Sequence, residues 1–142
     1  MKYDILIVGS GPGGYVSAIR AAQLGRRVAL VERAEAGGVC LNWGCIPTKA
    51  LLKSAQVYGY CRNAGHYGLE LTGEVRPDPE KIVARSRGVA ETMSKGVQFL
   101  LRKNNIDLIP GFGRLTAPGR LDVEGTTYEA DHIILATGAR PR

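Results

Sequence analysis

Residues 5–14, ILIVGSGPGG, decide the fold of this chain. The first four are an apolar run that ends at turn-forming residues, which predicts a short buried strand. Residues 13–24 then carry a broad apolar face at helical spacing, and Gly25 suits the C-cap of that helix. A second apolar run, Val28–Val31, ends at Glu32. A strand, a glycine turn, a helix and a second strand within about 30 residues predict a βαβ unit with a right-handed crossover.

The glycines of the turn have the spacing G-x-G-x-x-G, which predicts a site for a dinucleotide. Gly9 permits the tight turn, Gly11 lets the backbone approach a pyrophosphate, and Gly14 lets helix and strand pack closely. The following helix presents free N–H groups and the positive end of its dipole to the phosphates. Glu32 can bind the ribose hydroxyls of an adenosine and would repel a 2′-phosphate. The motif does not separate FAD from NAD, because both contain ADP.

The rest of the chain predicts helices and short strands. Apolar residues within 79–104 recur at spacings of three, four and seven, which predicts a long helix. Residues 115–128 alternate β-prone pieces with glycine turns, which predicts a small antiparallel meander. Residues 59–79 are rich in turn formers and predict no regular element. The remaining predictions are a helix over 46–58, a strand over 106–109 and a final buried strand over 133–136.

The stretch GGVCLNWGCIPTK, residues 37–49, contains two cysteines that can close a small disulfide loop. Cys45 stands at the start of a predicted helix, where the helix dipole stabilises a thiolate. Such a thiolate attacks disulfides and can donate charge to an electron-poor ring. Lys49 lies one helical turn further along and adds positive charge nearby. Cys40 and Cys45 are therefore predicted to be redox-active.

Two other interpretations of the cysteine pair stay open. One is a structural disulfide, which is uncommon in cytoplasmic proteins. The other is half of a zinc site, although no second pair of Cys or His stands at ligand spacing in the sequence. Cys61, His66 and His132 are isolated, and we expect them to be packing or surface residues. No metal site is predicted.

Composition narrows the classes of protein. The length of 142 residues fits one domain, and 19 basic against 13 acidic residues give a net charge of +6. The basic residues are scattered without an aromatic platform among them, so no nucleic-acid partner is predicted. No apolar run approaches the roughly 20 residues of a membrane span, and residues 1–4 show no signal-peptide pattern. Three cysteines, an odd number, argue against a secreted disulfide framework, so the expected location is cytoplasmic.

The motifs resemble those of the class I pyridine nucleotide-disulfide oxidoreductases along essentially all 142 residues. Within that family, Leu41 and Ile46 are typical of the dihydrolipoamide dehydrogenases, because glutathione and mercuric reductases tend to carry valine there. Trp43 is a departure, since valine is commoner at its position, and it concerns the packing near the disulfide rather than the chemistry. The motifs that carry the resemblance are GSGPGG, GGVCLNWGCIPTK, the GFG turn at 111–113 and ATGARP at 136–141.

The resemblance implies an α/β fold, a Rossmann-like FAD-binding domain with a parallel sheet, helices and a small antiparallel meander. It implies that Cys40 exchanges disulfides with a dithiol substrate and that Cys45 faces the isoalloxazine as the charge-transfer thiolate. Arg33 is expected near the adenine, Lys49 near the flavin N5 edge, and the Gly113 backbone at the adenine end. The expected FAD-binding residues are Gly9, Ser10, Gly11, Pro12, Gly14, Glu32, Arg33, Gly38, Cys40, Lys49, Gly113, Thr137 and Gly138.

The reaction that the resemblance implies is oxidation of a protein-bound dihydrolipoyl group, with electrons passing through Cys40–Cys45 to FAD and then to NAD⁺. The expected partner is the lipoyl-bearing carrier protein of a 2-oxoacid dehydrogenase or glycine cleavage complex. Residues 1–142 are expected to be the N-terminal FAD-binding domain of a larger, homodimeric multidomain protein whose NAD and interface domains are absent here. We do not expect NAD⁺-dependent turnover by this chain alone.

Two alternative functions follow from the same residues. A reductase for another disulfide or for a metal ion would share the family. A dinucleotide-binding module whose cysteines do no redox work would belong to a different class. Because the missing parts of a longer protein normally cover some of its surface, an exposed apolar patch is also expected.

Overall fold

The apolar runs on either side of the glycine turn form the centre of a six-stranded sheet with the order β3-β2-β1-β6-β5-β4. The computed structural model describes residues 2–139. β1 (Lys2–Val8) pairs in parallel with β2 (Val28–Glu32) and with β6 (Thr126–Leu135). β2 also pairs in parallel with β3 (Asp107–Pro110). The predicted strands on both sides of the glycine turn are thus confirmed.

The predicted meander is present and is joined to the parallel strands through β6. β4 (Gly113–Ala117) pairs antiparallel with β5 (Arg120–Val123). β5 pairs antiparallel with residues 126–129 of β6. Glu129 also pairs with β1, and the residues of β6 beyond it continue along β1. The mixed sheet agrees with an α/β, Rossmann-like domain.

A strand is present over residues 133–135 of the predicted 133–136, but it is the end of β6 rather than a separate element, and the prediction that it is buried is wrong. No glycine or proline follows Gly125 within β6, so one strand of ten residues serves both the meander and the parallel sheet. Its last side chains are open, with Leu135 61% exposed. Pairing with β1 satisfies the backbone hydrogen bonds of this strand. The side chains project perpendicular to the sheet, so this pairing does not bury them.

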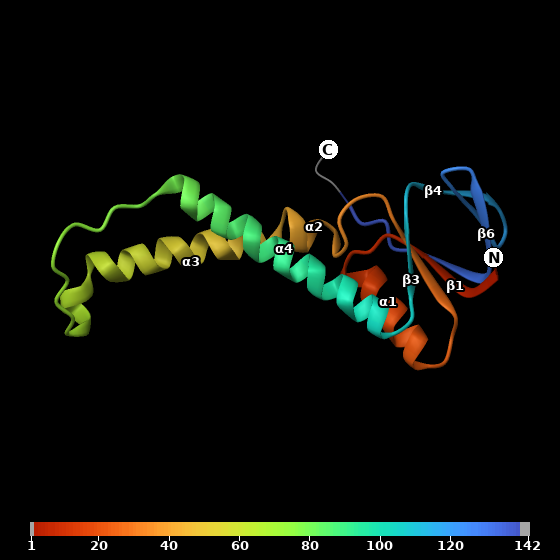
Figure 1. Ribbon diagram of the computed structural model, residues 1–142, viewed down its shortest axis with the longest axis horizontal. Helices are drawn as coiled ribbons and strands as arrows, with labels where there is room; N and C mark the ends of the chain where they lie inside the picture. Colours follow the sequence, from red (N-terminus) through yellow and green to blue (C-terminus); the bar gives the residue numbers. More distant parts are fainter. Residues whose placement is uncertain (1, 140–142) are drawn as a thin grey trace.

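Successive strand residues point to opposite faces of the sheet, and a core lies on each face. On one face lie α1 (Pro12–Gln23) and the C-terminal half of α4 (Pro79–Lys103), as Figure 1 shows. The core on that face includes Ile7, Ala18, Leu30, Val97 and Leu101. On the other face β5 packs against β1 and β2, and the core there includes Leu6, Ala29, Val31, Leu121 and Val123.

The long helix α4 starts where the sequence predicts. Asp78 is its N-cap, and the Asp78 carboxylate accepts a hydrogen bond from the Lys81 N–H at 3.1 Å. Pro79 occupies the first turn, where its missing N–H costs nothing. The helix ends at Lys103, and Asn104 is its C-cap.

The region between β2 and α4 is more helical than predicted. α2 (Gly38–Asn42) was not foreseen, and α3 (Cys45–Arg62) continues four residues past the predicted end at 58. Gly59 does not stop α3, because glycine weakens a helix without blocking its hydrogen bonds. The 3-10 helix η1 (Ala64–Tyr67) follows within the segment expected to be irregular.

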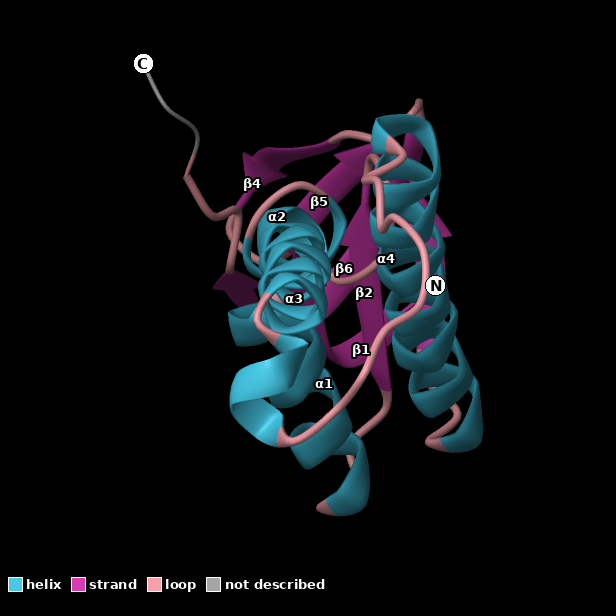
Figure 2. Cartoon of the chain, turned by 90° about the vertical axis from the view of Figure 1, so that its left-hand side faces the viewer, coloured by secondary structure: helices cyan, strands magenta, loops and turns pink. Residues whose placement is uncertain are grey.

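α3 and the N-terminal part of α4 lie side by side and project away from the sheet, as Figures 1 and 2 show. We call residues 45–85 the arm. The expected exposed apolar side chains occur there, and they include Leu51, Leu52, Val57, Tyr60, Tyr67, Leu69, Leu71, Val75 and Val83. Across residues 2–139, no helix combines the length and the apolar character needed to cross a membrane.

Candidate cofactor and disulfide site

The glycine turn between β1 and α1 is tight because two of its glycines touch backbone. Gly9 has a φ of 101°, and its N–H donates to the Val31 carbonyl at 2.8 Å. A Cβ at Gly9 would collide with the Ala136 carbonyl oxygen. A Cβ at Gly14 would collide with the Gly9 carbonyl oxygen. A side chain at either position would force the backbone to move, which confirms the close packing of helix and strand predicted for Gly14.

Gly11 has free space where a Cβ would lie, unlike Gly9 and Gly14. A Cβ added at Gly11 would meet no atom within 4 Å. Gly11 is also the N-cap of α1, and Pro12 is the first residue of that helix. Both residues line a cavity. The backbone of the turn is thus accessible from the side on which the N–H groups of a helix N-terminus favour an anion.

Two adjoining cavities lie along the carboxyl ends of the parallel strands. One has a volume of about 330 Å³ and extends from the glycine turn past Glu32 to α2. The other has about 290 Å³ and reaches Phe112 and Gly113. They share Gly9, Glu32, Arg33 and Thr137. A crevice at the carboxyl ends of the strands is the usual ligand position in open α/β sheets.

Glu32 stands between the two cavities, and the glycine turn holds its carboxylate. Oε2 accepts hydrogen bonds from the Ser10 hydroxyl at 2.7 Å and from the Ser10 N–H at 2.9 Å. Oε1 accepts one from the Ala34 N–H at 3.0 Å. Partial burial pushes the pKa of Glu32 upward, but these hydrogen bonds outweigh it, and the pKa lies below its ordinary value. A fixed, ionised carboxylate therefore faces both cavities and can accept hydrogen bonds from hydroxyls.

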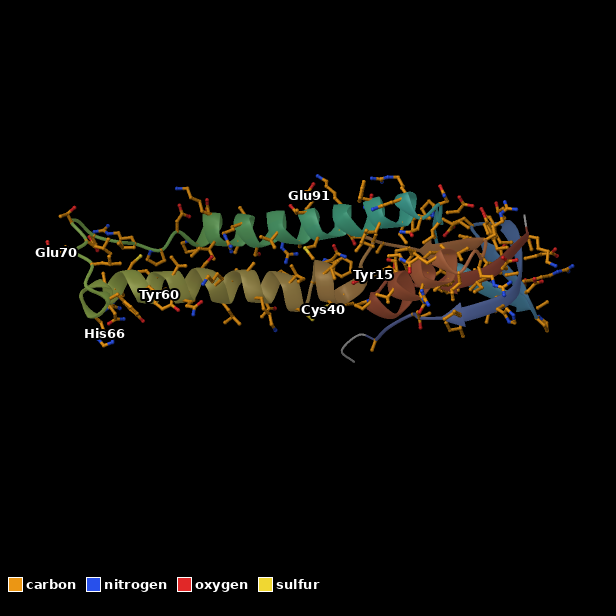
Figure 3. The ribbon with its side chains drawn as sticks, turned by 90° about the horizontal axis from the view of Figure 1, so that it is seen from below. Tyr15, Cys40, Tyr60, His66, Glu70 and Glu91 are labelled. Carbon is orange, nitrogen blue, oxygen red and sulfur yellow. A yellow bond between two sulfur atoms is a disulfide. The ribbon has the colours of Figure 1, made fainter. Side chains whose placement is uncertain are left out.

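Cys40 and Cys45 form a disulfide with their Cα atoms 4.7 Å apart. Cys40 lies in α2 and lines the larger cavity. Cys45 is the first residue of α3, as predicted, at the positive end of the helix dipole. Figure 3 shows Cys40 where the arm joins the sheet. One sulfur of the pair therefore belongs to a residue on the cavity wall, and the other belongs to a residue at a helix N-terminus.

Polar contacts from distant segments hold α2 in place. The Asn42 side-chain amide donates to the carbonyls of Ala36 at 3.1 Å and Gly38 at 3.0 Å. The Ser94 hydroxyl donates to the same Ala36 carbonyl at 2.8 Å, and Arg87 Nη1 donates to the Asn42 carbonyl at 2.9 Å. Ser94 and Asn42 are buried. Sequence reasoning missed all three residues. The partners of Ser94 and Arg87 are far away in the sequence, which gives no signal for such contacts, and the Asn42 contacts depend on the unpredicted helix α2.

The similarity of this chain to known proteins agrees with this arrangement. The family model described as pyridine nucleotide-disulphide oxidoreductase matches residues 3–142. The chain belongs to this family. Among curated relatives, the dihydrolipoyl dehydrogenase of Rhizobium etli is 51% identical, that of Zymomonas mobilis subsp. mobilis 54% and that of Bacillus subtilis 45%.

Each of these three alignments covers 99% of the chain. They cover 33%, 31% and 32% of the respective relatives. The chain thus spans about a third of the length of the curated relatives that it matches.

The structure gathers most of the residues expected to bind cofactor in this family. Ser10 lies under the turn, fully buried. Arg33 stacks over the Phe112 ring at 5.8 Å from its centroid, beside Gly113 in the smaller cavity. The expected residues that line the larger cavity are Gly9, Gly11, Pro12, Glu32, Arg33, Gly38, Cys40, Thr137 and Gly138. Arg140 and Pro141 of the ATGARP segment lie outside the described residues.

Lys49 is not among the residues that line these two cavities. It is exposed on α3, one turn beyond Cys45. Cys45 is likewise exposed and is not among the lining residues. The expected approach of Lys49 and Cys45 to the flavin stays a prediction.

The isolated residues singled out in the sequence lie away from this site. His66 is exposed and stacks edge-on against Tyr67, with ring centroids 5.4 Å apart. His132 is exposed on β6, and Cys61 is a free, partly buried thiol on α3. Within residues 2–139, no three His, Cys, Asp or Glu side chains are grouped so that they could hold a metal ion.

Proposed function

We propose that this chain is the FAD-binding, disulfide-carrying part of a dihydrolipoamide dehydrogenase. The observation that carries the proposal is the Cys40–Cys45 disulfide, whose Cys40 lies on the wall of the cavity that opens from the glycine turn. A non-redox dinucleotide module needs no disulfide at that place. The named relatives support dihydrolipoamide over other disulfides as substrate.

The residues present fit FAD as the cofactor. The open backbone at Gly11 accepts a pyrophosphate, and the carboxylate of Glu32 accepts hydrogen bonds from ribose hydroxyls. Phe112 and Arg33 offer flat surfaces for an adenine in the smaller cavity. Cys40, which lines the larger cavity, would then lie beside the ring system. When bound, FAD supplies the acceptor of the two electrons that leave the cysteine pair.

The chemistry of the chain itself is thiol–disulfide exchange. One thiolate of the substrate dithiol attacks Cys40 Sγ, the Cys40–Cys45 bond breaks, and Cys45 leaves as a thiolate. The second substrate thiol, once deprotonated, attacks the substrate sulfur of the mixed disulfide. The bond between that sulfur and Cys40 Sγ breaks, and Cys40 leaves as a thiolate. The substrate is then a cyclic disulfide, oxidised by two electrons, and the cysteine pair is reduced by two. The N-terminus of α3 stabilises the Cys45 thiolate in both steps.

We extend this proposal to the longer protein of which the chain is a part. We infer that it passes the electrons to NAD⁺ and that its substrate is the lipoyl group of a carrier protein in a 2-oxoacid dehydrogenase or glycine cleavage complex. We also propose a homodimer in the cytoplasm, where a cysteine pair that cycles between dithiol and disulfide is in keeping with the reducing conditions.

The absorbance spectrum of the purified chain with FAD tests the proposal. We expect flavin bands that stay with the protein, and a new long-wavelength band after addition of a dithiol, from a Cys45 thiolate beside the flavin. Cys45→Ser should abolish the new band, and the matched variant Cys61→Ser should keep it. Thiol counting should reveal two extra thiols on reduction. Flavin that never stays with the chain, or an unchanged thiol count, would contradict the proposal.

The activity of the longer protein gives a second test. We expect reduction of NAD⁺ by dihydrolipoamide, lost on Cys40→Ser, and no such turnover by residues 1–142 alone. Faster turnover with another disulfide and NADPH would show that the protein is a reductase of the same family with a different substrate.

A further inference from the structure

Trp43 occupies a position that the proposed chemistry does not explain. It is the only tryptophan of the chain, and it is 50% exposed. It lines the larger cofactor cavity together with Cys40. It also lines a third cavity, of about 330 Å³, between α2 and α4. Trp43 therefore lies between the cofactor cavity and the cavity beside α4.

The backbone that carries Trp43 is held from both sides. The Trp43 N–H donates to the Val39 carbonyl at 2.9 Å and closes the last turn of α2. Arg87 donates to the carbonyl of the preceding residue, Asn42. Cys40 lies in α2 and Trp43 is the C-cap of that helix. Both residues line the larger cavity.

We propose that the Trp43 indole is part of the FAD site and packs against the bound cofactor on the disulfide side of the cavity. The inference rests on the proposed FAD site. A half-exposed indole leaves a large apolar surface in water, and a planar ring system placed against it buries that surface and gains a stacking contact. Trp43 then contributes to cofactor affinity and shields the ring beside Cys40 from solvent.

The position of Trp43 at the edge of the cavity agrees with this role. A residue that only filled the core would be buried, as Leu41 is on the opposite side of α2. A residue that only covered the surface of α4 would not line the cavity of the glycine turn. Trp43 does both, because it ends α2 at the point where the two cavities meet.

The single indole permits a direct test in the chain of 15.2 kDa. We propose an FAD titration followed by the one indole N–H resonance and, separately, by the flavin retained on the protein. The resonance should shift as flavin binds and saturate at the same concentration. Trp43→Val should raise the Kd for FAD about 5- to 10-fold, as expected for loss of an aromatic contact. Trp43→Phe should raise it no more than about 2- to 3-fold, because a ring remains.

The controls distinguish the role of Trp43 from the existence of the FAD site. Tyr60→Val removes an exposed aromatic on the arm, far from Cys40 in Figure 3, and should leave the Kd unchanged. Flavin that is retained without a shift of the indole resonance overturns the role of Trp43 and leaves the FAD site standing. An unchanged Kd in both Trp43 variants does the same. Failure of the wild-type chain to retain any flavin overturns the FAD site and the role of Trp43 together.

Discussion

The sheet with its cavities and the arm use glycine in opposite ways. In the sheet region, a Cβ at Gly9, Gly14 or Gly38 would meet backbone atoms at close range. In the arm, a Cβ at Gly59 or Gly73 would meet no atom within 4 Å. Close contact between segments leaves no room for a side chain at the three sheet positions. No such contact excludes a side chain at the two arm positions. Contact with backbone thus requires glycine at these three positions beside the cofactor cavity, and no contact requires it at these two positions in the arm.

Gly14→Ala should give the largest effect. Its methyl group would collide with the Gly9 carbonyl oxygen, so α1 or the turn has to move. We expect a loss of about 3 kcal/mol in the free energy of unfolding, measured with urea, together with weakened FAD binding. The matched control is Gly13→Ala, whose Cβ would sit 3.9 Å from the Ala136 Cβ. Equal behaviour of the two variants would show that the turn is not tightly packed.

Arg87→Met should give the next largest effect. It removes the hydrogen bond to the Asn42 carbonyl and keeps the aliphatic stem of the side chain. We expect about 1–2 kcal/mol of lost stability and faster reduction of the Cys40–Cys45 disulfide by a small dithiol. The control is Arg114→Met on β4, an exposed residue. Unchanged stability and reduction rate in Arg87→Met would mean that α2 does not depend on α4.

Glu32 gives the sheet region a dependence on pH. Its pKa is lower in the folded chain than the ordinary value of 4.5, so its stabilisation is present above that value and is lost as the pH falls through the folded pKa. Glu32→Gln should therefore cost about 1 kcal/mol near neutral pH, after allowance for solvent screening, and less in acid. Urea unfolding of both proteins, at neutral pH and at a pH below the ordinary pKa of Glu32, measures this difference in the free energy of unfolding. Glu70→Gln on the arm, where Glu70 is exposed, should show no such difference (Figure 3).

Gly59→Ala should give the smallest effect and the opposite sign. The position lies within α3 and has open space around it, so a methyl group adds helix propensity without a clash. We expect a gain of about 0.5–1 kcal/mol, seen as a higher urea midpoint. A loss of stability there would mean that the arm is packed more closely than the structure shows.

The parts of the site that the sequence predicts are those that local rules govern. The glycine spacing, the apolar periodicity of residues 79–104 and the place of Cys45 at a helix start all depend on residues within a few positions of one another. The cavity residues from Gly9 to Gly138 followed from the family resemblance. These predictions could be made because each motif has a fixed backbone geometry.

The parts that could not be predicted depend on contacts between distant segments. Ser94 and Ala36 are 58 positions apart, and Arg87 and Asn42 are 45 apart. No spacing rule connects such pairs, so α2 and its supports were missed. The exposure of the end of β6 was also missed, because an apolar run alone does not show whether another layer covers it.

The pairing of β1 with β6 has a consequence for biosynthesis. β1 leaves the ribosome well before residues 129–135, its partner on one side, because those residues are synthesised more than a hundred positions later. The wall of the larger cavity is completed only by Ala136–Ala139, which follow β6. Nascent chains that end before β6 therefore lack both a neighbour for β1 and one side of the cavity. Cofactor loading must wait until translation has passed residue 139, and until then the edge of β1 is open to chaperones or to mispairing.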